Sequence, residues 1–342
     1  MSRRVEPPAP ALMARLAPEY LTILEQFPDG MLDLTNIQRA REVAHTRMDA
    51  AATRHDEPGV ATHDEVVPGR GRGESPRLRL YVPAARISPS GALLFMHGGG
   101  FVMGRASHFD VHCAEIARGT GCVVASVDYR LAPEFPYPAA LEDCFESLEF
   151  LVANSDRLGV DPARVAVGGV SAGAALAAAV ALMARDRGGP VIAFQSLEAP
   201  MLDHRNVTGS RHDLGHPKAW NRTANELAWR AYLGSPGHAA ALAYASPALA
   251  TNLAALPPAY VAVSALELFF DEAVQYSRRL VAAAVPVELH VYPNGFHGSS
   301  WAIPDMPLSQ RWRGDAIAAL KAAVGDRGDS GRSAAAGGAG RG

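Results

Sequence analysis

The sequence has 342 residues, of which 48% are hydrophobic and 20% are charged, with a formal net charge of −3 at pH 7. This is the composition of a globular protein, so wholesale disorder is excluded, and a strongly basic nucleic-acid-binding protein is not expected. The length suits one large domain with a smaller appendage. The longest small-apolar stretch, 172–184, is too short and too Ala-rich to predict a membrane-spanning helix.

The N-terminal segment 11–55 shows scattered helical periodicity and predicts one or two amphipathic helices. From residue 75 onward, short apolar runs typical of buried strands alternate with helical patterns. This alternation predicts a mostly parallel sheet with helices on both faces, an α/β fold. The predicted strands are 78–82, 92–96, 123–127, 164–168, 191–197, 260–264 and 287–292, and the predicted helices are 107–119, 138–153, 172–185, 271–284 and 309–323.

Two segments interrupt this rhythm. Residues 201–246 lack strand patterns and predict a helical insertion, which is expected to form a cap together with the N-terminal helices of residues 1–60. Residues 325–342 contain only Gly, Ala, Arg, Ser and Asp and predict a disordered tail, because they bury too little surface to become ordered. The core is therefore expected to comprise 61–200 and 247–324.

Cysteine usage indicates a reducing compartment. The three cysteines, Cys113, Cys122 and Cys144, are scattered along the chain. Their odd number and spacing predict neither a disulfide framework nor a metal site. The segment 11–17 is interrupted by Arg15, so it does not resemble the apolar core of a signal peptide. We therefore expect reduced, mostly buried thiols in a cytoplasmic protein.

The sequence Gly169-Val170-Ser171-Ala172-Gly173 is a G-x-S-x-G motif between a predicted strand and a predicted helix. This is the setting of a nucleophile elbow, a sharp turn that exposes a serine hydroxyl above the sheet. The N-terminus of the following helix would stabilise negative charge that develops there. Ser171 is therefore the predicted nucleophile.

A second glycine-rich motif, His97-Gly98-Gly99-Gly100-Phe101, follows the predicted strand 92–96. Consecutive glycines let backbone N–H groups approach a ligand without interference from a Cβ atom. The H-G-G-G sequence is typical of the oxyanion loop of lipases and esterases. His97 itself is expected to hold this loop through hydrogen bonds rather than to transfer protons.

A nucleophilic serine needs a base, and in these hydrolases the chain order is serine, acid, histidine. His297 lies in a loop just past the predicted strand 287–292, at a strand end where active sites gather. His290 lies within that strand and would point to one face of a packed sheet. His297 is therefore the favoured base.

Three carboxylates follow the predicted strand 260–264. Glu267 comes three residues after it and is the preferred acid, because a loop residue there can reach across the top of the sheet. Asp271 and Glu272 stay as alternatives, although they also fit the first turn of the next helix, where carboxylates stabilise the helix dipole.

Taken together, these motifs resemble the hormone-sensitive-lipase-like carboxylesterases, the bacterial family IV group within the α/β-hydrolase fold-3 family. The resemblance covers roughly residues 75–320 and implies an α/β-hydrolase fold with a helical cap. The segments that carry it are 97–101, 127–134, 169–173, 244–247, 256–259, 271–272 and 292–298.

The resemblance places the family's nucleophile on Ser171 and its base on His297. It places the oxyanion donors on the backbone N–H groups of Gly98, Gly99 and Ala172.

The family's acid falls on Glu267, in the run Glu-Leu-Phe-Phe-Asp-Glu at 267–272, where most relatives have Asp-Pro-Leu-Arg-Asp-Glu. Val170 departs from the Asp or Thr that usually precedes the nucleophile.

We therefore expect a serine carboxylesterase that hydrolyses small short- to medium-chain acyl esters through a Ser-His-Glu triad and an acyl-enzyme. The expected partner is a small-molecule ester, with no metal, organic cofactor, nucleic acid or membrane involved, and a homodimer is left open. An amidase, a lactonase or a dehydratase-type enzyme on the same scaffold stays as an alternative. A non-catalytic ligand receptor is disfavoured, because Ser171 and His297 are both present.

Overall fold

The computed structural model describes residues 14–52, 58–68, 75–212, 216, 218–234 and 242–325. Except for Gly325, the predicted disordered tail lies outside these residues, as do both ends of the predicted helical segment 11–55.

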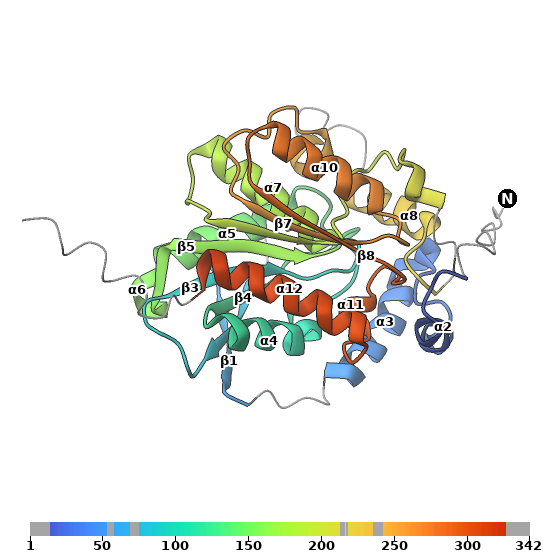
Figure 1. Ribbon diagram of the computed structural model, residues 1–342, viewed down its shortest axis with the longest axis horizontal. Helices are drawn as coiled ribbons and strands as arrows, with labels where there is room; N and C mark the ends of the chain where they lie inside the picture. The colour runs from blue at the N-terminus through green and yellow to red at the C-terminus, as the bar shows by residue number, and fades with distance from the viewer. Residues whose placement is uncertain are drawn as a thin grey trace, which may run out of the picture.

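An eight-stranded sheet forms the centre of the molecule, in the order β1-β2-β4-β3-β5-β6-β7-β8 (Figure 1). The strand β2 runs antiparallel to both of its neighbours, β1 and β4. The other strands, β4, β3, β5, β6, β7 and β8, run parallel to one another. The predicted mostly parallel sheet is thus confirmed. The strands are β1 (Val60–Val66), β2 (Arg77–Pro83), β3 (Ser90–Met96), β4 (Val123–Asp128), β5 (Val160–Val170), β6 (Phe194–Glu198), β7 (Ala259–Ser264) and β8 (Val287–Tyr292).

Helices cover both faces of the sheet, so its central strands β3 and β7 are buried at every position and consist mostly of apolar residues. Leu93 and Phe95 of β3 pack towards α4 (Asp110–Thr120) and α12 (Pro307–Val324). The alternate residues Leu94 and Met96 pack towards the opposite layer, as the two-residue period of a strand requires. That layer consists of α5 (Ala139–Ala153), α7 (Ala172–Arg187) and α10 (Phe270–Ala282).

The Ala-rich stretch 172–184 is the buried part of α7, where small side chains let the helix lie close to the sheet. None of the described helices has the length and apolarity needed to cross a membrane.

Two predicted strands start three or four residues away from the expected position. The strand expected over 164–168 is part of β5, which spans Val160–Val170. The strand expected from residue 191 begins at Phe194, and Val191 is 73% exposed. An apolar run alone did not show where this segment enters the sheet. Two short helices, α6 (Ser155–Leu158) and α11 (Ser299–Ala302), were not predicted at all.

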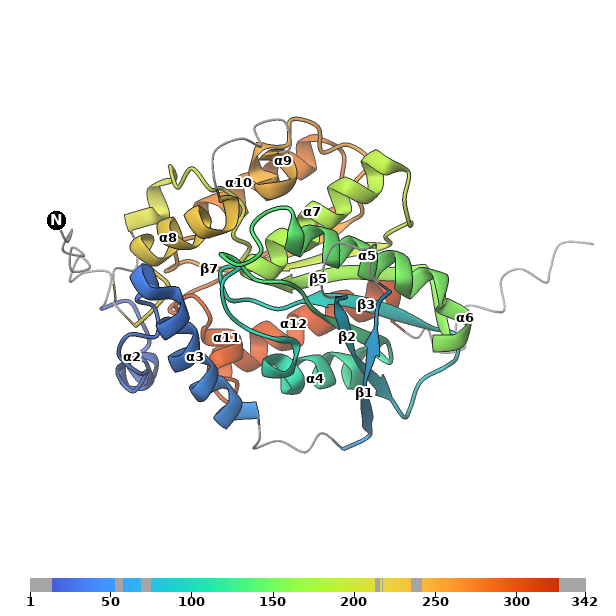
Figure 2. The same cartoon turned by 180° about the vertical axis from the view of Figure 1, so that it is seen from behind.

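The N-terminal helices 18–25 and 37–52 and the helix 222–233 of the insertion 201–246 lie together at the carboxyl ends of the parallel strands (Figures 1 and 2). A separate apolar cluster joins Tyr20 and Phe27 of the N-terminal segment to Ala219 of the insertion and Phe296 of the loop after β8. These segments contain α2 (Pro18–Glu25), η1 (Leu34–Asn36), α3 (Ile37–Ala52), η3 (Gly209–His212), α8 (Arg222–Leu233) and α9 (Leu242–Ala245).

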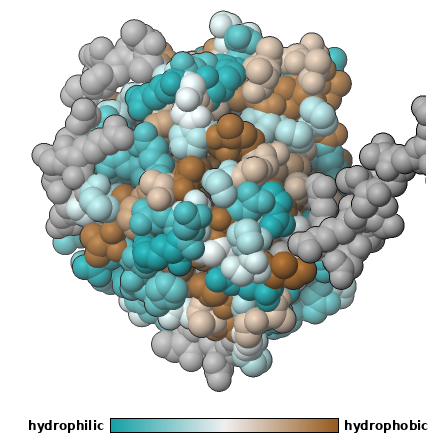
Figure 3. All heavy atoms as spheres, turned by 90° about the vertical axis from the view of Figure 1, so that its left-hand side faces the viewer, coloured by the Kyte–Doolittle hydropathy of each residue, from teal (hydrophilic) through white to brown (hydrophobic). Residues whose placement is uncertain are grey.

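Ligands of open α/β sheets bind at the carboxyl ends of the strands, so these helices lie over the expected site. On the opposite end of the molecule, hydrophilic and hydrophobic residues are interspersed (Figure 3).

Candidate active site

Ser171 occupies a strained turn between β5 and α7. Its backbone has φ 57° and ψ −120°, a conformation that costs free energy for a residue with a side chain. Its N–H donates to the carbonyl oxygen of Glu198 at 2.8 Å. A Cβ atom on either Gly169 or Gly173 would overlap the carbonyl oxygen of Met96. The two glycines therefore let strand and helix approach closely enough to form the turn.

The side chains of Ser171, His297 and Glu267 form a continuous hydrogen-bonded chain. The Oγ of Ser171 lies 2.9 Å from Nε2 of His297, and Nδ1 of His297 lies 2.5 Å from Oε2 of Glu267. A carboxylate only accepts hydrogen bonds, so the imidazole hydrogen belongs on Nδ1, and Nε2 can accept from the serine hydroxyl. The exposed fractions of these residues are 3%, 9% and 1%, so water competes little for these bonds.

Glu267 is held by its own loop as well as by His297. Its second carboxylate oxygen, Oε1, accepts from the N–H of Ser264 at 2.8 Å. The longer glutamate side chain therefore folds back towards the end of β7 and still reaches the imidazole. The ring of Phe269 meets that of His297 edge to face at 4.8 Å and limits the rotation of the imidazole.

The two alternative carboxylates have other bonding partners. The carboxylate of Asp271 accepts from the N–H of Ser210 at 2.7 Å. Oε2 of Glu272 accepts from the N–H groups of Leu202 and Asp203, both at 2.6 Å. Burial raises the pKa of Glu272, which the two N–H donors partly oppose. Beyond their predicted place in the first turn of α10, both carboxylates anchor the insertion to the core.

His290 is remote from this chain. Its Nε2 lies 2.8 Å from Oε1 of Glu288, and its Nδ1 lies 3.3 Å from Oδ2 of Asp315. It therefore belongs to a polar cluster on strand β8 and helix α12, away from Ser171.

The predicted oxyanion donors lie around the serine. Gly98 is so close to Ser171 that a Cβ on this glycine would stand 3.5 Å from the serine Cβ. No acceptor within the described chain is bonded to the N–H of Gly98 or Gly99. Ala172 is the first residue of α7, and the first N–H groups of a helix have no acceptor within it.

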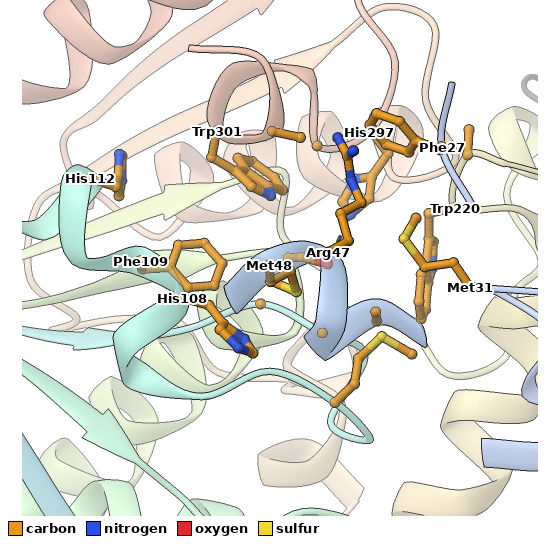
Figure 4. A pocket seen from close by; sticks show the side chains of 18 of the residues that line it. Phe27, Met31, Arg47, Met48, His108, Phe109, His112, Trp220, His297 and Trp301 are labelled. Atoms are coloured by element: carbon orange, nitrogen blue, oxygen red, sulfur yellow. Dashed lines mark hydrogen bonds between the residues drawn. The ribbon is translucent and has the colours of Figure 1, made fainter. Parts of the chain in front are cut away.

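Ser171, His297, Gly98 and Gly99 line one cavity of about 620 Å³. Figure 4 shows the rings of Trp220, Phe27, Trp301 and Phe109 around it, with α3 contributing Arg47 and Met48. Trp220 and Phe27 lie in the two segments predicted to form a cap, whereas no sequence pattern marked Trp301 or Phe109, because apolar residues on helices and loops are equally typical of a core. Among the described residues, no three His, Cys, Asp or Glu side chains gather as metal ligands do.

The sequence and the fold both match known proteins. Residues 93–300 match the model of a family described as having the alpha/beta hydrolase fold. The chain belongs to the α/β-hydrolase fold family. As predicted, its relatives and structural neighbours are hormone-sensitive-lipase-like esterases.

Among the family's curated members, Esterase LipI of Mycobacterium tuberculosis is 40% identical over 206 residues, which are 60% of this chain and 64% of LipI. The match thus spans slightly less than two thirds of that relative. Carboxylesterase NlhH of the same organism is 34% identical over 250 residues, 72% of this chain and 78% of NlhH.

Solved structures match a larger share of this chain than these sequence relatives do. A bacterial heroin esterase superposes with a TM-score of 0.87 at 36% identity, over 92% of this chain and 99% of that one. The esterase LipW from Mycobacterium marinum gives 0.83 at 36% identity, over 94% of this chain and 99% of its own.

His97 fixes the start of the glycine-rich motif in this α/β-hydrolase. Its ring stacks on Tyr129 at 4.1 Å, and its Nδ1 donates to the carbonyl oxygen of Gly98 at 2.8 Å. The hydroxyl of Tyr129 donates to the carbonyl oxygen of His97 at 2.7 Å. Complete burial lowers the pKa of His97 to about 4, and the bond to Gly98 opposes this only in part.

This lowered pKa makes stability depend on pH. A histidine in the unfolded chain has a pKa of about 6.5, so below that pH the unfolded chain binds a proton that His97 in the folded protein does not bind. The free energy of unfolding should therefore fall between pH 6.5 and pH 4, and His97 should contribute roughly 3 kcal/mol to that fall. Urea unfolding across that range should show a smaller decline for His97→Asn, which keeps a donor but does not titrate. Parallel declines in the two proteins would contradict this assignment.

Proposed function

We propose that this chain is a serine carboxylesterase in which Ser171, His297 and Glu267 form the catalytic triad. The observation that carries the proposal is the hydrogen-bonded chain from Glu267 through His297 to Ser171, in the wall of an apolar cavity. The esterase names of its relatives support an ester rather than another acyl substrate.

The geometry supports a two-step reaction. The Oγ of Ser171 attacks the ester carbonyl while Nε2 of His297 takes the hydroxyl proton. The imidazolium returns that proton to the leaving alkoxide, and the acyl group stays on Ser171. Water, activated by the same nitrogen, then releases the acid. Throughout, the Glu267 carboxylate stabilises the positive charge on the imidazole and keeps its hydrogen on Nδ1.

We assign the stabilisation of the negative charge on the tetrahedral intermediate to the backbone N–H groups of Gly98, Gly99 and Ala172. These donors are fixed in place before reaction, so they stabilise developing charge without reorganisation. Ala172 adds the positive end of the α7 dipole, since its N–H points out of the first turn of that helix.

We further propose that the N-terminal helices and the insertion 201–246 act as a cap that limits substrate size. Trp220 of the insertion lies against Gly100, where a Cβ would overlap its ring, and its indole N–H donates to Asn225.

The cytoplasmic location and the possibility of a homodimer stay part of the proposal. The free and buried Cys113, Cys122 and Cys144 are consistent with a reducing compartment.

The nucleophile assignment predicts the behaviour of Ser171→Ala. The variant should lose hydrolysis of p-nitrophenyl acetate by at least about a thousandfold, because the attacking oxygen is gone. Its melting temperature should change little. Ser300→Ala is the matched control, since this buried serine is three residues from His297 and its hydroxyl has no bonded partner within the described chain. Full activity in Ser171→Ala would place the nucleophile elsewhere.

The acid assignment predicts opposite outcomes for two carboxylates. Glu267→Gln keeps the shape but removes the charge and permits the wrong imidazole tautomer, so kcat should fall up to about ten-thousandfold. Asp271→Asn weakens only the bond to Ser210 and should retain most activity with reduced thermal stability. Steady-state kinetics and melting curves on both variants check this. A folded but inactive Asp271→Asn beside an active Glu267→Gln would reverse the assignment.

The cavity predicts a preference for short acyl chains. A space of about 620 Å³ must hold both the acyl and the alcohol part of the ester. Esters of acids with about two to six carbons should therefore give higher kcat/KM than esters of more than about twelve carbons. A series of p-nitrophenyl esters measures this. Faster turnover of the long-chain members would show that the cap does not limit acyl length.

A further inference from the structure

The N-terminal helix α3 is bonded to the chain that follows the glycine-rich motif. Nε of Arg41 donates to the carbonyl oxygen of Val102 at 2.8 Å, and a terminal nitrogen of its guanidinium donates to that of Ala132 at 3.0 Å. One helical turn further on, Nε2 of His45 lies 3.1 Å from the backbone nitrogen of Gly104. Residues four apart share one helix face, so α3 holds this loop at two points along one face.

Gly104 in turn lies directly against the glycine-rich motif. It has a φ of 96°, and a Cβ there would stand 2.5 Å from the carbonyl oxygen of Gly98 and 2.7 Å from Nδ1 of His97. No side chain fits at this position. The backbone of Gly104 therefore packs directly against Gly98. If Gly104 moved, Gly98 would have to move with it.

The lone pair of His45 can be assigned to Nε2. A neutral imidazole has one accepting nitrogen, and the buried N–H of Gly104 has no other acceptor within the described chain. Leaving that N–H unpaired would be costly. The hydrogen then lies on Nδ1, so this atom does not accept from Arg105, whose terminal nitrogen is 2.9 Å away. The guanidinium of Arg105 is half-exposed and lies 3.8 Å from Oδ2 of Asp49, so it can donate to that carboxylate and to water instead. Burial, followed by the charge of Arg105, lowers the pKa of His45 and favours the neutral ring.

We propose that His45 is a positioning residue, which through Gly104 holds the Gly98 N–H where it can donate to the oxyanion formed at Ser171. The inference rests on the proposed function above. It gives α3 a role beyond covering the cavity, because a helix from the N-terminal segment then sets the geometry of a donor in the core. Neither His45 nor Gly104 touches the reacting atoms in this account.

Two substitutions separate positioning from packing. His45→Gln places a carbonyl oxygen close to where Nε2 stands, so it keeps an acceptor for Gly104. His45→Phe keeps a ring beside His108, whose own ring lies at 4.9 Å, but has no acceptor. Arg39→Gln on the same helix is the matched control, since the exposed side chain of Arg39 is bonded to the exposed Glu42 of α3.

The measurement is kcat and KM for p-nitrophenyl acetate, together with melting temperature. His45→Phe should lower kcat by about tenfold or more with KM within about twofold, because a displaced oxyanion donor weakens the transition state more than substrate binding. His45→Gln should restore most of kcat, and Arg39→Gln should match the wild type. If His45→Phe does not fold, His45→Asn replaces it, because its acceptor is one atom too short to reach Gly104.

Equal kcat in the acceptor-free and acceptor-retaining variants would overturn the proposal, as would a loss of kcat that simply follows the loss of melting temperature. An inactive wild-type chain, or an active Ser171→Ala, would instead overturn the proposed function. The two failures are therefore distinguishable in one set of assays.

Discussion

The turn at Ser171 is the constraint on which the rest of the site depends. A residue with a side chain is held at φ 57° because its N–H is bonded to Glu198 on the neighbouring strand and because Gly169 and Gly173 admit the carbonyl of Met96. Strain of this kind persists only where the surroundings over-determine the backbone. The same close approach brings β3 beside β5, so the glycine-rich motif that follows β3 emerges next to the serine.

The remaining groups reach Ser171 because parallel strands end at one edge. Glu267 follows β7 and His297 follows β8, so both loops begin at the edge where Ser171 stands. The sheet fixes the start of each loop, and local bonds fix the rest. Ser264 holds one oxygen of Glu267, and Phe269 limits the ring of His297. Placement by backbone and neighbouring side chains is what a preorganised site needs.

Much of the fold was predictable, because buried strands alternating with helices leave a strong apolar pattern. The residues of the proposed triad could also be named from the sequence, since Ser171 sits in a recognisable motif and His297 and Glu267 follow apolar strands. What the sequence could not show were contacts between distant segments. The anchoring of the insertion by Asp271 and Glu272, and the contact of His45 with Gly104, join residues about 60 to 70 positions apart. The residues next to each partner in the sequence show no pattern that predicts which distant residue it will contact.

The central claim is that Ser171 carries the acyl group while the N–H groups of Gly98, Gly99 and Ala172 stabilise the oxyanion. A crystal structure of the protein after reaction with a fluorophosphonate tests this most directly, because the phosphoryl oxygen occupies the place of the oxyanion. We expect a phosphorus bonded to Oγ of Ser171, with the phosphoryl oxygen within about 3 Å of the backbone nitrogens of Gly98, Gly99 and Ala172. A phosphorus on another residue, or a phosphoryl oxygen directed away from these N–H groups, would contradict it.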